Sequence, residues 1–146
     1  MDPLSVASAA ATITVSCIKV STLLYTWIDE IKNIDGALRA FLSEVNALSA
    51  VLDAVKSCSQ DALLTDVSQR QDTSAFWVLV QKTLEDCGTV VGELERILMD
   101  VASRRGLGQL ITNSLLNVQS GKIALLRQQI QSFTTVLQMA MQMINV

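Results

Sequence analysis

The residue types that most often carry catalysis are sparse in this chain of 146 residues, which contains no histidine. Histidine is the usual general base near neutral pH and the commonest metal ligand. The three cysteines, Cys17, Cys58 and Cys87, lack the spacing of a zinc site or a redox pair. We therefore expect three reduced thiols in the core of an intracellular protein, and no bound metal.

The carboxylates do not form a catalytic pattern either. Glu85 and Asp86 are adjacent, and Glu93 and Glu95 are two apart, so on a helix neither pair shares a face. The chain also lacks a glycine-rich phosphate loop and the turn that presents a nucleophilic serine. These absences predict a protein that is not an enzyme and has no cofactor.

Apolar residues recur at steps of three and four along most of the chain, which is the periodicity of helices that bury one face. Half of the residues are hydrophobic, proline occurs once, and strand-like alternation is absent. The pattern predicts one all-α domain over residues 1–146, a four- or five-helix bundle. The expected helices are about 3–31, 35–57, 73–104, 109–118 and 121–145, with a polar loop from Ser57 to Thr73.

The first predicted helix is weakly charged, since Lys19 is its one charged residue between Pro3 and Ile28. Its apolar stripe comprises Val6, Ala10, Ile13, Cys17, Val20, Leu24, Trp27 and Ile31. The uncharged run from Pro3 to Ile18 is shorter than the roughly 20 residues of a spanning helix. We expect no permanent membrane anchor, although the whole helix is long enough to cross a bilayer if released.

A second stripe of the first helix is made of small side chains, Ser8, Thr12 and Ser16. Small residues let a neighbouring backbone approach closely. Gly88 and Gly92, four apart in the third helix, are the expected partners of this stripe at a close helix crossing.

Charge is distributed unevenly, because all 14 acidic residues precede position 101. The basic residues beyond that point are Arg104, Arg105, Lys122 and Arg127. They either pair with acidic groups of neighbouring helices or form a cationic face for anionic lipid or an acidic partner. An acidic chain without a basic, aromatic patch is not expected to bind nucleic acid.

The last helix has an apolar face wider than one stripe, because Val136, Met139 and Met143 extend it beyond Ile130 and Leu137. Such a helix is either central in the bundle or covered by a partner, which makes self-association an expectation. Alternatively, Met139, Met141 and Met143 suit an adaptable pocket for a small lipid-like molecule.

The opening Met1-Asp2-Pro3-Leu4-Ser5-Val6 and the order of the helices resemble the fungal N-terminal domain of STAND (NOD-like receptor) and ankyrin-repeat proteins. This family is related to HeLo-like domains and also heads proteins of azaphilone pigment clusters, as the protein L N-terminal domain. The resemblance implies a HeLo-like bundle that serves as effector or adaptor in the cytoplasm, with recruitment to the plasma membrane. It also implies a NACHT or ankyrin-repeat region after Val146. In the HeLo-like group the first helix is thought to insert into membranes and cause programmed cell death.

Under this expectation, membrane contact is assigned to Leu4, Val6, Ile13, Val15 and Ile18. Contact with anionic headgroups or an acidic partner is assigned to Arg104, Arg105, Lys122 and Arg127. The alternative interpretation is a soluble module for protein–protein interaction or oligomerisation, followed by a carrier of a lipid-like ligand.

Overall fold

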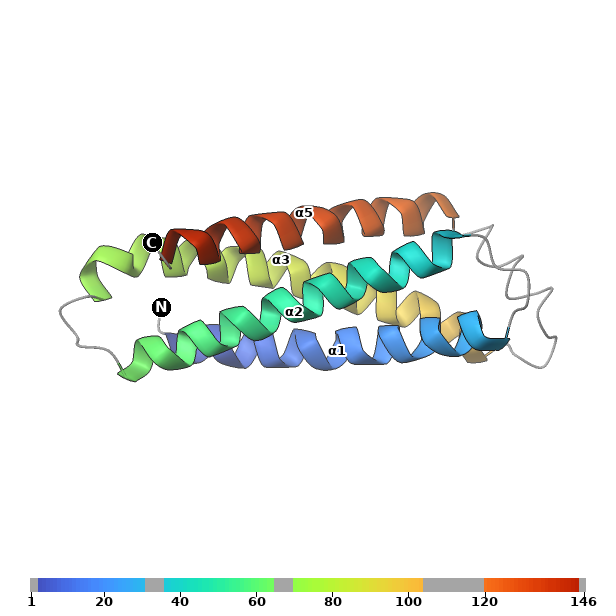
Figure 1. The fold of residues 1–146 in the computed structure, drawn as a ribbon, viewed down its shortest axis with the longest axis horizontal. Helices are drawn as coiled ribbons and strands as arrows, with labels where there is room; N and C mark the ends of the chain where they lie inside the picture. The colour runs from blue at the N-terminus through green and yellow to red at the C-terminus, as the bar shows by residue number, and fades with distance from the viewer. Residues whose placement is uncertain (1–2, 31–35, 65–69, 104–119, 145–146) are drawn as a thin grey trace.

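A computed structural model of the chain describes residues 3–30, 36–64, 70–103 and 120–144, and all of these are α-helical (Figure 1). The helices are α1 (Pro3–Glu30), α2 (Gly36–Leu64), α3 (Arg70–Ser103) and α5 (Ser120–Ile144). The predicted all-α class is confirmed. The short helix predicted at 109–118 lies outside the described residues.

The four helices form an elongated bundle in which α1 and α5 are diagonal to each other. Helix α1 packs against α2 and α3, and α5 packs against the same two helices. Along the chain the helices alternate in direction, so α1 and α3 run one way while α2 and α5 run the other (Figure 1). Because α1 and α5 are diagonal, their outward sides face away from each other.

The core is built from the predicted apolar stripes. On α1, Val6, Ile13 and Leu24 are buried together with the other described members of the stripe. The large side chains that are most completely buried come from all four helices, among them Phe41, Leu48, Leu84, Leu98 and Leu137. Burial of one such side chain contributes about 1.5–3 kcal/mol to folding, so the stripes hold the bundle together.

Near the start of α3, two adjacent aromatic residues are buried to different extents. Trp77 is buried, whereas Phe76 is only partly buried and packs against the core from its edge. The two rings meet edge to face with centroids 5.1 Å apart. The larger indole takes the inner position, and the phenyl ring extends the same cluster outward.

The predicted loop from Ser57 to Thr73 is wrong at both ends, because α2 continues to Leu64 and α3 begins at Arg70. The polar residues after Ser57 do not stop the helix. Ser59 is fully buried, and its Oγ donates a hydrogen bond to the Val55 carbonyl at 2.7 Å. Since the helix backbone itself satisfies this hydroxyl, the serine costs the core little.

The small stripe of α1 does not form the predicted close crossing. Ser8 and Thr12 are exposed, and the Thr12 hydroxyl bonds to the Ser8 carbonyl. The crossing instead pairs Gly88 with a core residue, since a Cβ on Gly88 would lie 3.6 Å from Ile13 Cδ1. A Cβ on Gly92 would meet nothing within 4 Å. Helix α3 therefore approaches α1 at Gly88 and leaves space beside Gly92.

Candidate functional site

Helix α1 carries a second apolar stripe on the side away from the core, which we call the α1 outer face. It consists of Leu4, Ala11, Val15, Ile18, Thr22 and Tyr25. Successive members are separated by seven, four or three residues, so they lie along one side of the helix. Leu4, Val15, Ile18 and Tyr25 are each more than half exposed. Helix α1 is thus apolar on two opposite sides, of which the bundle covers one.

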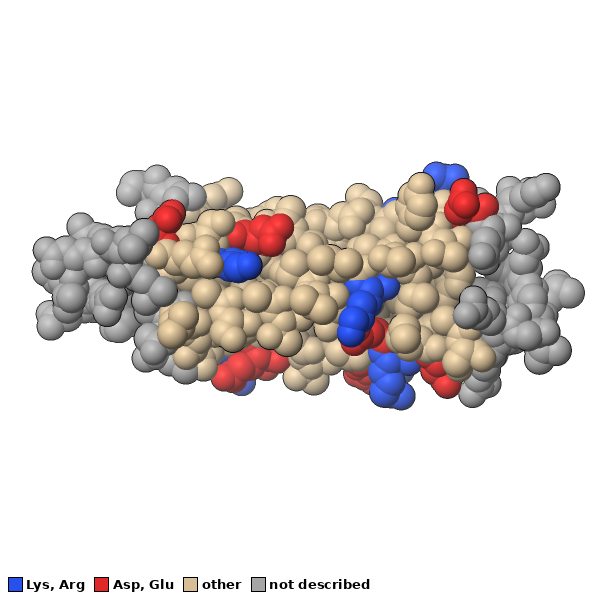
Figure 2. All heavy atoms as spheres, turned by 90° about the horizontal axis from the view of Figure 1, so that it is seen from below, with Lys and Arg blue, Asp and Glu red and all other residues tan. Residues whose placement is uncertain are grey.

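The molecule seen from the α1 side has a largely uncharged surface (Figure 2). Charged side chains occur in separate places, and uncharged surface runs continuously between them. Within the described residues, α1 is the one helix long and apolar enough to cross a membrane, over Leu4–Asp29 with a mean hydropathy of 1.5. A third of this apolar segment is buried inside the bundle, and the core helix of a soluble protein can be equally long and apolar. The exposed stripe is what distinguishes α1 from an ordinary core helix.

The threonines of α1 are internally satisfied. The hydroxyls of Thr12, Thr14, Thr22 and Thr26 each donate to the carbonyl four residues earlier, at 2.8 to 3.0 Å. A hydroxyl that already has an acceptor loses less when water is removed from it. The threonines of α1 are therefore compatible with an apolar environment.

Lys19 is held at the edge of this surface by α3. Its Nζ lies 3.7 Å from Glu95 Oε1, close enough for an ion pair but too far for a hydrogen bond. The pair borders an open groove of about 560 Å³ between α1 and α3, and Gly92 lines its floor. Ile18 and Met99 form part of the groove wall. The groove thus continues the α1 outer face toward α3.

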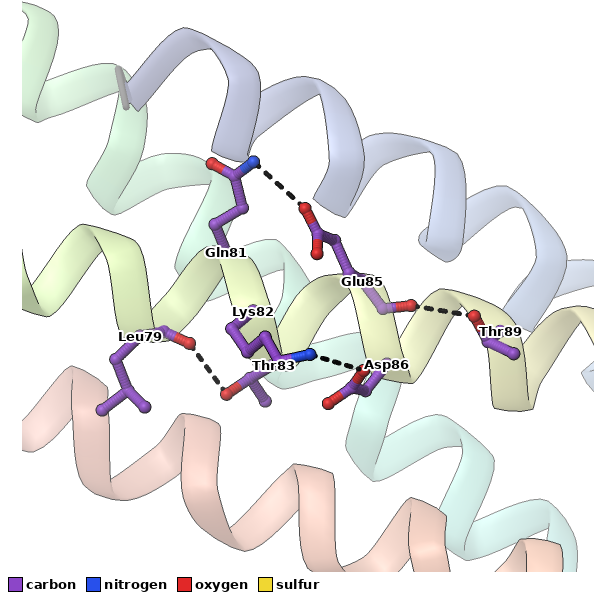
Figure 3. Close-up of polar contacts among 7 residues, drawn as sticks. All are labelled: Leu79, Gln81, Lys82, Thr83, Glu85, Asp86 and Thr89. Atoms are coloured by element: carbon purple, nitrogen blue, oxygen red, sulfur yellow. Dashed lines mark hydrogen bonds and ion pairs between the residues drawn. The ribbon is translucent and has the colours of Figure 1, made fainter.

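The exposed side of α3 differs from that of α1, because its polar groups bind one another (Figure 3). Gln81 donates to Glu85 at 3.3 Å, and Lys82 pairs with Asp86 at 3.7 Å. The Thr83 hydroxyl donates to the Leu79 carbonyl, and the Leu79 side chain is directed toward α5. This stretch of α3 thus combines bonded polar groups with the exposed side chains of Val78 and Leu79.

Arg127 is not free to bind a headgroup, because it is engaged with α2. Its Nε and Nη2 donate to the two carboxylate oxygens of Glu44 at 2.8 and 2.9 Å, and Gln131 donates to the same carboxylate. The guanidinium also stacks over the Phe41 ring, 5.4 Å from its centroid. These contacts lower the pKa of Glu44, chiefly through the hydrogen bond from Arg127, and raise the pKa of Arg127.

Lys122 is engaged in the same way with α3. Its ammonium group forms an ion pair with Glu93 and lowers the pKa of that carboxyl by hydrogen bonding. Arg104 and Arg105 lie outside the described residues. For Lys122 and Arg127, the structure supports the expectation that basic groups complement acidic neighbours, and it shows no free cationic face at these positions.

The residues assigned to membrane contact from sequence fall on both sides of α1. Leu4, Val15 and Ile18 lie on the α1 outer face, whereas Val6 and Ile13 are buried in the core. Val6 and Ile13 can reach a lipid only if α1 leaves the bundle. The prediction combined residues of the two stripes because both stripes repeat at helical steps.

Tyr25 and Ala11 belong to the same surface but were not singled out from sequence. Their signal is the spacing from Leu4 and Ile18, which continues the same side of the helix toward its C-terminal end. Tyr25 is the most exposed large side chain of α1, and its amphipathic ring suits a boundary between water and an apolar phase.

Two of the three cysteines occupy the predicted interior positions. Cys17 and Cys87 are buried, and burial raises the pKa of each thiol to about 12. Cys58 is partly buried, and its pKa is raised by the same cause. In the part of the chain that the structure describes, no group of three or more acidic, cysteine or histidine residues is placed to hold a metal ion.

Comparison with known proteins identifies the family of the chain. Residues 1–146 match the family model described as pigment biosynthesis cluster protein PigL N-terminal, so the chain belongs to this family. No curated protein and no solved structure matches the chain.

Proposed function

We propose that this member of the PigL N-terminal family is a non-catalytic effector domain that acts at a membrane through the outer face of α1. In this role the chain would be the N-terminal domain of a receptor-type protein that also has a NACHT or ankyrin-repeat region, as the resemblance implies. The description of the family indicates that such a domain can also form the N-terminal part of a pigment biosynthesis cluster protein. The exposed stripe of α1 is the observation that carries the membrane part.

The α1 outer face is suited to lie in the interfacial region of a bilayer. Four large side chains project from one side of a helix whose threonines are internally bonded. If each loses half of its area to lipid, the gain is on the order of 1 kcal/mol per side chain. The sum is sufficient for weak, reversible attachment, as for other interfacial helices.

Attachment by this face does not require the bundle to open. Insertion of α1 across the bilayer would, because Val6, Ile13 and Leu24 would have to leave the core. Removing them exposes the apolar sides of α2 and α3 as well, at a cost of several side chains' burial energy. We therefore propose docking of the intact bundle as the first step, and release of α1 as a later, triggered step.

The lipid charge preferred by this face follows from the described ion pairs. The protein has a formal charge of −3, and both Lys122 and Arg127 are paired within the bundle. These two positions of α5 therefore supply little attraction to anionic headgroups. We expect the apolar contact to dominate, so that neutral vesicles bind the domain as well as anionic ones.

The test is vesicle flotation with neutral phosphatidylcholine vesicles and with vesicles that also contain phosphatidylserine. Ile18→Glu removes an apolar contact of the α1 outer face, and Val78→Glu on α3 is its control. The two side chains are matched at 56% and 55% exposed, and each variant's fold is checked by circular dichroism.

We expect the wild type and Val78→Glu to float with the vesicles and Ile18→Glu to stay in solution. Equal flotation of both folded variants would overturn the role of the α1 outer face. No flotation of the wild type with either vesicle would leave a protein–protein interaction module as the function.

A further inference from the structure

The outward side of α5 carries another apolar stripe that the bundle does not cover, here called the α5 seam. It consists of Leu125, Gln129, Ser132, Val136, Met139 and Met143. The steps alternate between four and three throughout, which is the spacing of the a and d positions in a helix that packs against another helix. Leu125, Met139 and Met143 are each more than half exposed, and Val136 is 37% exposed.

We propose that the α5 seam binds the α5 seam of a second copy of this chain. This surface is independent of the membrane proposal, since α5 is diagonal to α1 in the bundle. The alternating spacing fits a facing helix, whose side chains can enter the spaces between those of the seam. Charge and side-chain chemistry then select an identical helix.

Two α5 helices can approach each other without repulsion. No charged residue occurs from Gln128 to the end of the helix at Ile144. The basic residues before this segment, Lys122 and Arg127, are neutralised by Glu93 of α3 and Glu44 of α2. A charged partner would gain nothing along this segment, whereas a neutral copy loses nothing.

The polar positions of the seam are also self-complementary. Gln129 can donate and accept a hydrogen bond, and Ser132 is small enough to receive a larger side chain from the facing helix. When two identical surfaces are related by a two-fold axis, each residue of the α5 seam faces a residue of the α5 seam in the second copy. The seam thus provides apolar knobs, space between them and one amide for register.

The size of the seam sets the strength of the association. From Leu125 to Met143 the helix is roughly 27 Å long at 1.5 Å per residue. One helix pair of this length falls at or below the low end of specific interfaces, about 1,200 Å² in total. We therefore expect a weak, concentration-dependent dimer rather than a permanent one.

Sedimentation equilibrium over a wide concentration range tests the proposal with the 146-residue chain. We expect the wild-type mass to rise from 15.8 kDa toward twice that value, and Met139→Glu to stay at the monomer mass. Met139 is 60% exposed, so the glutamate variant should fold, as circular dichroism will show. Ile18→Glu on α1 is the control, and its mass should rise like that of the wild type.

Three outcomes would overturn the α5 seam as a self-association surface. One is a wild type that remains monomeric at the highest concentration. Another is a mass increase that Met139→Glu does not reduce. The third is loss of association in Ile18→Glu as well as Met139→Glu, which would indicate that α1 of one copy binds α5 of the next.

Discussion

The Arg127–Glu44 contact joins α5 to α2 through two hydrogen bonds and a stacked phenyl ring. Both side chains are largely shielded from water, with 24% and 16% of their surface exposed. A carboxylate in this position is stabilised by charge-assisted hydrogen bonds, and its protonation turns one of the two acceptor oxygens into a donor, which weakens the contact with Arg127. The contact should therefore make stability depend on pH.

Glu44→Gln tests this dependence, because glutamine has the shape of the protonated carboxyl but never ionises. The pKa of Glu44 is lower in the folded protein, so its contribution is present above the unfolded carboxyl pKa of about 4 and is lost as the pH falls through the folded value. We expect the wild type to exceed Glu44→Gln in free energy of unfolding by about 1–3 kcal/mol at pH 7. Urea titrations at several pH values should show this difference shrinking in acid. A difference independent of pH would contradict the assignment.

Gly92 is a second residue whose replacement has a predictable effect. It lies inside α3, and a Cβ at this position would meet no atom within 4 Å. Alanine should raise the free energy of unfolding by about 0.5–1 kcal/mol, because it restricts the unfolded chain without a clash. Gly121 has the same free space but lies one residue from the start of α5, so Gly121→Ala should gain less. Thermal unfolding of both variants measures the contrast, and destabilisation by Gly92→Ala would contradict it.

At the scale of the helices, periodicity predicted the inward stripe of α1, but it did not separate the outer stripe from it among the residues assigned to membrane contact. Val6 and Leu4 are two residues apart on α1, and both belong to apolar sets at helical steps. Only the neighbours α2 and α3 decide that Val6 is buried and Leu4 exposed. The helix that carries the candidate surface was therefore predictable from the sequence, whereas the side of the helix that is exposed was not.

The end of α2 was unpredictable for a related reason. Ser59 and Gln60 have the composition of a loop, yet tertiary packing and a hydroxyl-to-backbone bond keep Ser59 in a helix. Likewise Ser8 and Thr12 have the size needed at a close crossing, but Gly88 takes that place against Ile13. In both cases the position of the neighbouring helix determines the outcome, and the local sequence does not specify that position.

Helix α1 itself gives a direct measure of whether it stays in the bundle at a membrane. The Cys17 thiol is buried, and burial raises its pKa to about 12, so it should not react with a thiol reagent at neutral pH. If the intact bundle docks, Cys17 remains protected on vesicles; if α1 is released, it becomes reactive. We expect protection on docking, read by mass spectrometry of the labelled peptide, with urea-unfolded protein as the fully labelled control. Rapid labelling of Cys17 on vesicles alone would show that binding already releases α1.

At the scale of the whole molecule, charge and apolar exposure divide between the two diagonals of the bundle. Most of the described charged residues lie on α2 and α3, while α1 and α5 carry the uncovered apolar stripes. Acidic residues of α2 and α3 form ion pairs with Lys19 of α1 and with Lys122 and Arg127 of α5. The molecule therefore has two apolar surfaces directed away from each other, kept apart by a solvated pair of helices.

In a dimer joined at the α5 seams, the two α1 outer faces lie on the far sides of the assembly, because α1 is diagonal to α5. One flat membrane can contact one of these faces, and the other remains free for a second membrane. The dimer should thus bridge vesicles rather than bind one vesicle more tightly.

Vesicle clustering, followed by turbidity or light scattering, measures this bridging. The wild type should cluster neutral vesicles at protein concentrations where the dimer forms, and vesicle excess should reverse the clustering by separating the copies. Met139→Glu should still float with vesicles but fail to cluster them, because a monomer has one α1 outer face. Ile18→Glu should neither float nor cluster, although it dimerises. If Met139→Glu clusters vesicles as strongly as the wild type, the two α1 faces are not joined through α5, and the diagonal placement of α1 and α5 has no part in membrane bridging.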